Sequence, residues 1–252
     1  MTSILRLFVA VAAVLIVALP AVAQSVSPAQ RKEIEAIIKD YLIKNPEVLQ
    51  EAFGELEKRQ AAAEAAKHQN AVKEHAEAIF NSTHQVVLGN PQGDVTMVEF
   101  FDYNCGYCKR ALADMLEVMK GDKKLRVVLK EFPVLGEGSV EAARVSIAAR
   151  MQDGGKKFLD FHQKLMNSRG SIGRPQALAV AKDAGFDMAR LEKDMASQEP
   201  RATIEESFKL ADALGLSGTP SYVIGPQVVV GAVGVANLKE KINAARCGKA
   251  VC

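Results

Sequence analysis

The spacing of apolar residues divides the chain into a helical N-terminal region and a later region that alternates strands with helices. Between residues 24 and 81, large apolar side chains recur at the spacing of one helix face. Ser27-Pro28-Ala29-Gln30 has the order of a capping box with a proline in the first helical turn, and Asn45-Pro46 opens a second helix. The two apolar stripes consist of Ile34, Ile37, Ile38, Tyr41 and Leu42, and then of Leu49, Ala52, Phe53 and Leu56.

Two short striped helices do not bury their apolar faces on each other without cost. From residue 57 to residue 77 the stripe fades into Ala, Glu, Lys, Gln and His, which predicts a solvated helical spacer. The striped helices therefore dock either on the main domain or on copies of themselves. The spacer holds them away from the main domain and favours the oligomer.

The pattern changes to alternating strands and helices at Val86. The runs 95–101 and 125–132 are rich in strand formers, and a helix that continues through Met119 lies between them. Strand, helix and strand at this spacing form a right-handed βαβ unit with a parallel sheet. Residues 139–214 favour helices throughout, and strands return at 221–224 and 227–233 before a last helix at about 237–246. The predicted fold class is α/β, with a sheet that is split by an all-helical insertion at about 139–214.

The first 23 residues have the pattern of a secretory signal peptide. Arg6 is followed by a 13-residue apolar run from Leu7 to Leu19, and then by Pro20 and an A-x-A cleavage site at 21–23. A membrane anchor is the alternative, but the run is shorter than the ~20 apolar residues that span a bilayer. We therefore expect a signal peptide at 1–23, a helical oligomerisation and spacer region at 24–81, and a catalytic domain at 82–252. The exported protein would act in the periplasm.

Composition excludes two broad classes of protein. The 252 residues carry a formal net charge of +2, which is too balanced for a dedicated nucleic-acid binder. Four Cys are too few for a disulfide-rich scaffold, so any cysteine chemistry depends on where the four lie.

Cys105 and Cys108 form a CGYC motif at the junction of a predicted strand and the start of a predicted helix. Unpaired N–H groups and the helix dipole at that position stabilise a thiolate at Cys105 and lower its pKa. Cys108 lies one turn further along the same face, where it can resolve a mixed disulfide at Cys105 or form a disulfide with it. A passive disulfide and half of a zinc site are the alternatives. A redox pair is favoured, with no cofactor and no metal.

The residues around this motif resemble the DsbA-like thiol:disulfide oxidoreductases of the thioredoxin superfamily. The resemblance covers about 86–246 and is carried by EFFDYNCGYC at 99–108, KEFPVLG at 130–136, the helical insertion and GTPSYVIG at 218–225. It implies a thioredoxin fold, a cis Pro220 opposite the CGYC motif, and a substrate platform formed by Thr219, Pro220 and Tyr107. An ordinary proline at a strand start is the alternative for Pro220. A backbone segment at Thr219 can pair with an extended substrate chain.

Glu99 is expected in an inner strand that is buried on both faces, where an ionisable group is costly unless it has a partner or a task. The family often keeps an acidic group beneath the CGYC position. Glu99 is therefore assigned as the proton partner of Cys108, with a pKa raised by burial. The alternative is a carboxylate that reaches solvent or pairs with Lys130 on the neighbouring strand.

The N-terminal helices resemble those of the ScsC (suppressor of copper sensitivity) branch, through KNPEVLQEA at 44–52 and the Ala-rich helix that follows. In that branch the extension can make a trimer, so the resemblance implies a homotrimer. Thr219 replaces the Val typical of DsbA oxidases and is similar to isomerase-type proteins. Three sites on helical stalks would suit the reshuffling of misfolded substrates.

The remaining cysteines and histidines carry weaker signals. Cys247 and Cys252 close the tail as CGKAVC, which favours a small disulfide over a relay pair or an intermolecular link. His68 and His75 lie seven residues apart on the spacer, where solvated polar residues are favoured over a metal site. His162 lies on an apolar stripe and is expected to be a core histidine with a buried hydrogen bond.

The favoured function is an exported thiol:disulfide interchange protein that isomerises or reduces disulfides. It would act on unfolded or misoxidised exported proteins and depend on a membrane redox partner. Alternatives are a DsbA-type oxidase, a Cu(I) carrier that uses the two thiolates, and a chaperone-like protein with an unused CGYC pair. The sequence lacks the Met or Cys cluster that a copper carrier would add.

Overall fold

The computed structural model describes residues 27–252, and its internal contacts divide the chain into two compact units after Lys58. The predicted signal peptide lies outside the described residues. Within 27–252, no helix has the length and apolar character required to cross a membrane.

The first unit contains the two predicted N-terminal helices. Helix α2 spans Pro28–Lys44, and helix α3 spans Glu47–Glu74 and continues into the second unit. The predicted capping box is confirmed, because Ser27 and Gln30 exchange both side-chain to backbone hydrogen bonds. No residue of α2 is buried. Seven side chains of the predicted stripes are 42–61% exposed, and they are Ile34, Ile37, Ile38, Tyr41, Leu49, Phe53 and Leu56.

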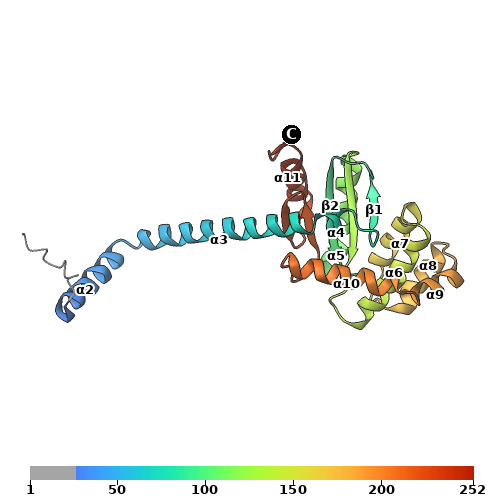
Figure 1. Ribbon diagram of the computed structural model, residues 1–252, viewed down its shortest axis with the longest axis horizontal. Helices are drawn as coiled ribbons and strands as arrows, with labels where there is room; N and C mark the ends of the chain where they lie inside the picture. The colour runs from blue at the N-terminus through green and yellow to red at the C-terminus, as the bar shows by residue number, and fades with distance from the viewer. Residues whose placement is uncertain (1–26) are drawn as a thin grey trace, which may run out of the picture. The chain divides into compact units, whose positions relative to one another are not determined.

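The second unit is a five-stranded sheet with helices on both faces (Figure 1). Its strands are β1 (Val86–Gly89), β2 (Val95–Phe101), β3 (Leu125–Glu131), β4 (Ser221–Ile224) and β5 (Gln227–Val230). Its helices are the end of α3, α4 (Ala76–Phe80), α5 (Gly106–Gly121), α6 (Glu137–Gln152), α7 (Lys156–Met166), α8 (Arg174–Asp183), α9 (Met188–Met195), α10 (Glu199–Ala213) and α11 (Gly234–Cys247).

Strand β2 occupies the middle of the sheet, whose order is β1-β3-β2-β4-β5. It pairs in parallel with β3 and antiparallel with β4, and β1 and β5 add antiparallel edges. The predicted parallel βαβ unit, formed by β2, α5 and β3, is confirmed. Helices α6–α10 lie between β3 and β4 in the chain and form the predicted insertion. Figure 1 shows α6 to α9 grouped beside the sheet.

Side-chain alternation along β2 builds two separate cores. Met97 and Phe101 belong to a core with α5, α11 and the insertion, whereas Val98 and Phe100 belong to a core on the other face with α10. By the same alternation, Glu99 shares the face of Met97 and Phe101.

The second core also includes residues that the sequence analysis placed in the spacer. Val72 at the end of α3 and Ile79 in α4 are 5% and 0% exposed, and both pack with Val98 and Phe100. The predicted boundary at 81/82 therefore lies inside a packed unit. The sequence analysis did not identify the short helix α4, because a five-residue helix has too few apolar positions to show a periodic pattern. Its burial becomes visible only in the tertiary contacts.

The insertion is joined to the first core by a buried polar cluster. The hydroxyl of Tyr103 lies 2.8 Å from Ser146 Oγ and 3.0 Å from His162 Nδ1. Burial lowers the pKa of His162 to about 3, so its ring is neutral. His162 is thus the core histidine with a buried hydrogen bond that its apolar stripe predicted.

Lys130 is the main buried charge of the second face. Its side chain is fully buried, and its Nζ lies 3.1 Å from Glu206 Oε1 on α10. Glu206 also accepts a hydrogen bond from Ser82 Oγ at 2.9 Å. Burial lowers the pKa of Lys130, and the Glu206 carboxylate opposes that effect.

Replacing Glu206 with Gln leaves the Lys130 ammonium buried without its counter-charge, so we expect E206Q to lower the free energy of unfolding by roughly 2–4 kcal/mol. Adding Lys130→Met to E206Q removes the unpaired charge and should restore most of the loss. Urea unfolding measures both. The matched control is Glu205→Gln on the same helix, whose exposed pair with Arg201 contributes little. Equal losses in E206Q and E205Q would contradict this account of the buried pair.

Candidate functional site

The CGYC motif lies where β2 ends and α5 begins. Cys105 is the N-cap of α5, with extended backbone, and its Sγ accepts the Cys108 N–H at 3.4 Å. Both residues are buried, and Cys105 is 6% exposed against 1% for Cys108. Both are free thiols. The structure therefore shows the reduced form of the pair, and not the disulfide that the sequence analysis assigns to its oxidised form.

The loop before β4 lies against this pair. The Thr219–Pro220 peptide bond is cis, as the family resemblance implied. Cys105 Sγ–H donates to the carbonyl oxygen of Thr219 at 3.1 Å. The side chain of Thr219 also lowers the pKa of Cys108, because it stabilises the thiolate form. Thr219 thus contacts Cys105 directly and lowers the pKa of Cys108.

Two buried groups beneath the motif influence each other's protonation. Burial raises the pKa of Cys108 well above its usual value, and the Glu99 carboxylate adds to the rise. Burial, followed by the charge of Asp114, raises the pKa of Glu99 to about 8. Protons are therefore retained on both groups at neutral pH, and the ionisation of one disfavours the ionisation of the other.

Neither structural alternative for Glu99 is supported. Glu99 is 3% exposed, so it does not reach solvent freely. Lys130 aligns with Phe100 in the register of β2 and β3 and binds Glu206 on the opposite face. The cross-strand neighbour of Glu99 on β4 is instead Tyr222. The pKa of Tyr222 is raised, first by burial and then by Glu99.

Tyr107, which the resemblance assigns to the substrate platform, is the accessible side chain between the two cysteines. It is 60% exposed, and the Arg110 guanidinium lies 4.5 Å from its ring centroid. Tyr107 lies two residues after Cys105, which is the less buried cysteine of the pair.

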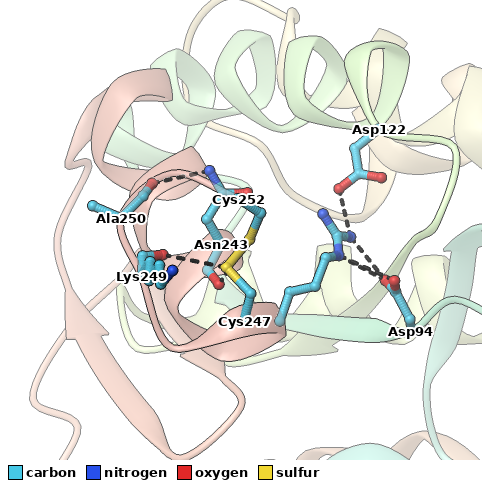
Figure 2. The surroundings of a disulfide bond; sticks show 8 residues. Asp94, Asp122, Asn243, Cys247, Lys249, Ala250 and Cys252 are labelled. Carbon is cyan, nitrogen blue, oxygen red and sulfur yellow. Dashed lines mark hydrogen bonds and ion pairs between the residues drawn. A yellow bond between two sulfur atoms is a disulfide. The ribbon is translucent and has the colours of Figure 1, made fainter.

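The other two cysteines form a disulfide at the end of α11. Cys247 and Cys252 are bonded, and both are exposed (Figure 2). Asn243 Nδ2 donates to the carbonyl oxygen of Ala250 at 3.0 Å and holds the tail that contains Cys252. The small tail disulfide favoured by the sequence is therefore present.

The position of this disulfide separates it from the CGYC motif. Arg246, next to Cys247, pairs with Asp122 at the C-terminal end of α5 and with Asp94 at the start of β2. Cys105 lies at the opposite end of the 16-residue helix α5, and a helix of that length spans about 24 Å. Direct transfer between the two pairs within one chain is excluded by this distance, which removes the intramolecular relay alternative.

Sequence reasoning missed several residues that surround the pair. Tyr222 is the cross-strand neighbour of Glu99, the charge of Asp114 raises the pKa of Glu99, and the carbonyl of Asp102 accepts the Cys105 N–H. The position of Asp102 within the EFFDYNCGYC run was the one available signal. His68 of the spacer lies 3.2 Å from Glu64, and no group of three or more metal-ligating side chains occurs among residues 27–252.

A dithiol at the start of the helix after the central strand, opposite a cis-proline loop, defines a protein of the thioredoxin-fold class. The chain belongs to the DSBA-like thioredoxin domain family, whose model matches residues 96–243. A second family model, the copper resistance protein ScsC N-terminal domain, matches residues 30–63. The predicted fold class and both predicted resemblances are confirmed.

Solved structures and a curated relative agree with this assignment. A thioredoxin-like oxidoreductase from Silicibacter pomeroyi is 43% identical, with a TM-score of 0.65 over 68% of this chain and 96% of that one. Proteus mirabilis ScsC is 27% identical, with a TM-score of 0.65 over 89% and 98% of the two chains. Disulfide bond formation protein D of Bacillus subtilis is 29% identical over 66% of this chain and 78% of that protein. The chain thus lies in the DsbA and ScsC class of thiol:disulfide oxidoreductases.

Other curated relatives are larger proteins. The chain spans about a quarter of the length of the Na⁺/H⁺ antiporters that it matches. The one from Salinispora arenicola is 24% identical over 64% of this chain and 25% of the antiporter.

Glu99→Gln removes a group whose pKa is about 8 in the fold and near 4.5 in the unfolded chain. Between these values the unfolded chain has lost the proton and the fold retains it, so wild-type stability falls with rising pH by up to ~1.4 kcal/mol per unit. The stability gain of E99Q over the wild type should therefore grow from pH 4.5 to pH 8 and then level off. Urea unfolding of the reduced proteins measures it, with the exposed Glu117→Gln on α5 as control. A gain that is constant across this range would refute the buried acid.

Proposed function

We propose that this protein exchanges disulfides in exported proteins, with Cys105 as attacking thiolate and Cys108 as resolving thiol. The observation that carries the proposal is the difference in burial between the two sulfurs at the start of α5. Cys105 is the helix N-cap and is 6% exposed, whereas Cys108 is 1% exposed and its pKa is raised. Of the two thiols, the first is therefore assigned to meet the substrate sulfur.

Exchange starts from the dithiol form. The Cys105 thiolate attacks one sulfur of a substrate disulfide, so a Cys105–substrate bond forms, the substrate S–S bond breaks, and a substrate thiolate leaves. The leaving thiolate takes up a proton. In isomerisation, another substrate thiolate attacks the mixed disulfide, which returns Cys105 to its thiolate and leaves the substrate with a new pairing. Electrons are conserved within the substrate.

Reduction requires Cys108 to act as the second nucleophile. Cys108 loses its proton, attacks Cys105 Sγ, forms the Cys105–Cys108 disulfide and releases the second substrate thiol. A raised pKa at Cys108 makes this deprotonation the difficult step. The ionised form of Glu99, which is the minor form at neutral pH because its pKa is about 8, is the group that accepts the proton.

Isomerase or reductase activity is favoured over oxidase activity because the residue before the cis-proline is Thr219, as in isomerase-type proteins, and not the Val typical of DsbA oxidases. These activities require a membrane redox partner that returns the pair to the dithiol form. Thr219, Pro220 and the exposed Tyr107 form the surface on which a substrate chain would lie. Export to the periplasm accords with the sequence of residues 1–23, and a similar Salmonella enterica structure is described as a periplasmic thioredoxin-like protein.

The N-terminal helices are proposed to assemble a trimer of residues 24–252. The apolar stripe of α2 and the start of α3 is exposed within one chain, and burying it against further copies of the chain would remove that apolar surface from water. The match to the ScsC N-terminal domain covers the same residues. Three catalytic domains on one stem would raise the local concentration of thiols around one substrate.

The roles of the two cysteines predict opposite behaviour for their Ser variants. Cys108→Ser keeps the attacking sulfur but cannot resolve, so it should accumulate a covalent mixed disulfide with a scrambled substrate protein. Cys105→Ser should form none and should lose essentially all activity in scrambled-substrate refolding. Non-reducing electrophoresis and refolding yield measure these outcomes. Full activity in Cys105→Ser would overturn the proposed chemistry.

The trimer predicts that assembly depends on the apolar stripe. Light scattering of the chain 24–252 should give three times the monomer mass, and the chain 59–252 should be monomeric. Ile37→Glu with Phe53→Glu should dissociate the full chain, because both side chains are 61% exposed within one chain and a charge disfavours their burial. Lys39→Glu, at a polar position of α2, is the matched control. A monomeric 24–252 chain would refute the trimer.

A further inference from the structure

Two segments of the chain that meet at the start of α5 carry positive charge only. Residues 104–110 run from the turn before α5 into the helix, and residues 168–174 run from the end of α7 to the first residue of α8. Together they contain four Lys or Arg and no Asp or Glu. These four cations, which form a basic rim, are Lys109, Arg110, Arg169 and Arg174. None of them pairs with a carboxylate within residues 27–252.

Hydrogen bonds hold the second segment against the first. Asn104 Oδ1 accepts the Ile172 N–H at 2.7 Å, and Asn104 Nδ2 donates to the Ile172 carbonyl oxygen at 2.8 Å. Lys109 Nζ donates to the Ser168 carbonyl oxygen at 2.9 Å. A Cβ at Gly138, in the first turn of α6, would lie 2.8 Å from the Ile172 carbonyl oxygen, so α6 also packs directly on this segment. The second segment is therefore fixed to the start of α5 at two points.

Two cations of the basic rim lie in the first turns of α5. The Lys109 N–H donates to the Cys105 carbonyl oxygen at 3.0 Å, and Arg110 is the next residue. The Arg110 guanidinium carbon is 4.5 Å from the ring centroid of Tyr107, the exposed side chain assigned to the substrate surface. One charge of the rim thus adjoins the surface on which a substrate chain would lie.

The two arginines of the second segment are placed by the hydrogen bonds of their neighbours. Arg169 follows Ser168, whose carbonyl oxygen binds Lys109. Arg174 follows Ile172 by two residues, a span of at most about 7 Å. Both arginines are exposed. Surface charges interact over about 10 Å at 0.1 M salt, so the rim acts on the charges of a substrate at the dithiol without direct contact.

The positive charge is concentrated at this end of α5. The whole chain has a formal net charge of +2, whereas the basic rim places four positive charges in two short segments. Glu137, which precedes Gly138 at the start of α6, is an exposed acid beside the second segment and offsets one of the four. A patch of one sign raises the local concentration and the association rate of ligands of the opposite sign.

We propose that the basic rim selects disulfides that are flanked by acidic residues. This inference rests on the proposed function and adds a substrate class to it. The attraction acts on the approach of the substrate, and therefore on the second-order rate constant, while the bonds that form and break at Cys105 stay the same. Added salt screens the charges and weakens the preference.

The test compares three disulfide peptides that differ only in the residues beside the cysteines, which are Glu, Gln or Lys. Acid-quenched time courses with the reduced protein give a second-order rate constant for each peptide. Each constant is divided by that for dithiothreitol with the same peptide, which corrects for the effect of Glu or Lys on the leaving thiol. At about 0.1 M salt the wild type should react about 10-fold faster with the Glu peptide than with the Gln peptide, and more slowly with the Lys peptide. At about 1 M salt the three should agree within about two-fold.

Arg169→Glu with Arg174→Glu reverses two charges of the basic rim at exposed positions. At about 0.1 M salt the corrected rate constant should fall about 10-fold for the Glu peptide, rise for the Lys peptide and change by less than about two-fold for the Gln peptide. A changed pKa of Cys105 would shift all three peptides together, so the opposite signs report the charge of the substrate. If this variant does not fold, Arg169→Gln with Arg174→Gln must show smaller changes in the same directions.

The matched control is Lys120→Glu with Lys123→Glu. These exposed lysines lie at the C-terminal end of the 16-residue helix α5, about 24 Å from its start, and the change in net charge is the same. At about 0.1 M salt this distance exceeds two screening lengths, so the ratios among the three peptides should stay as in the wild type.

The outcomes distinguish this inference from the proposed function. A wild type that reacts with all three peptides at equal corrected rates would overturn the substrate class and leave the exchange activity standing. Ratios that do not change in Arg169→Glu with Arg174→Glu, or that change equally in the lysine control, would overturn the role of the basic rim. A wild type that reacts with none of the peptides would refute the exchange activity itself.

Discussion

The site depends on the central position of β2 in the sheet. Because β3 and β4 cover its two edges and helices cover its two faces, every side chain of this strand from Met97 to Phe101 is buried. The strand therefore delivers the chain to the start of α5 at a fixed point, with Cys105 at the helix N-cap and Cys108 one turn further along the helix. The difference between the two thiols follows from where the strand ends, since the cysteines are only three residues apart.

The sheet and the turn after β2 bury ionisable groups, and three of them are accommodated in different ways. Lys130 of β3, on one face, is paired with Glu206. Asp102, directly after β2, accepts hydrogen bonds from three segments. Glu99 of β2, on the other face, is accommodated by retaining its proton, because burial raises its pKa to about 8. Glu99 is the one that interacts with Cys108, and its pKa allows it to exchange a proton near neutral pH.

Much of the second unit was predictable from local patterns. The strand at 95–101, the strand predicted at 125–132 and found at 125–131, and the helix after CGYC all follow from residue spacing. Element ends were less accurate: β5 ends at Val230 instead of 233, and α11 begins at Gly234 instead of 237. Short edge strands and glycine-rich turns have too few residues for periodicity to fix their ends.

The sequence by itself determined the CGYC motif, its place between a strand and a helix, the helical insertion and the apolar stripe of the N-terminal helices, because each is written in residues close together in the chain. Tertiary structure decided what lies around the sulfurs: the Thr219 carbonyl, Tyr222 opposite Glu99, and the Asp102 contacts with Leu135 and Ser139. Those partners are more than 30 residues apart in the chain, and only the packing of β2 between β3 and β4 brings them together. The sequence predicted that burial raises the pKa of Glu99, but the size of the rise, to about 8, depends on that same packing.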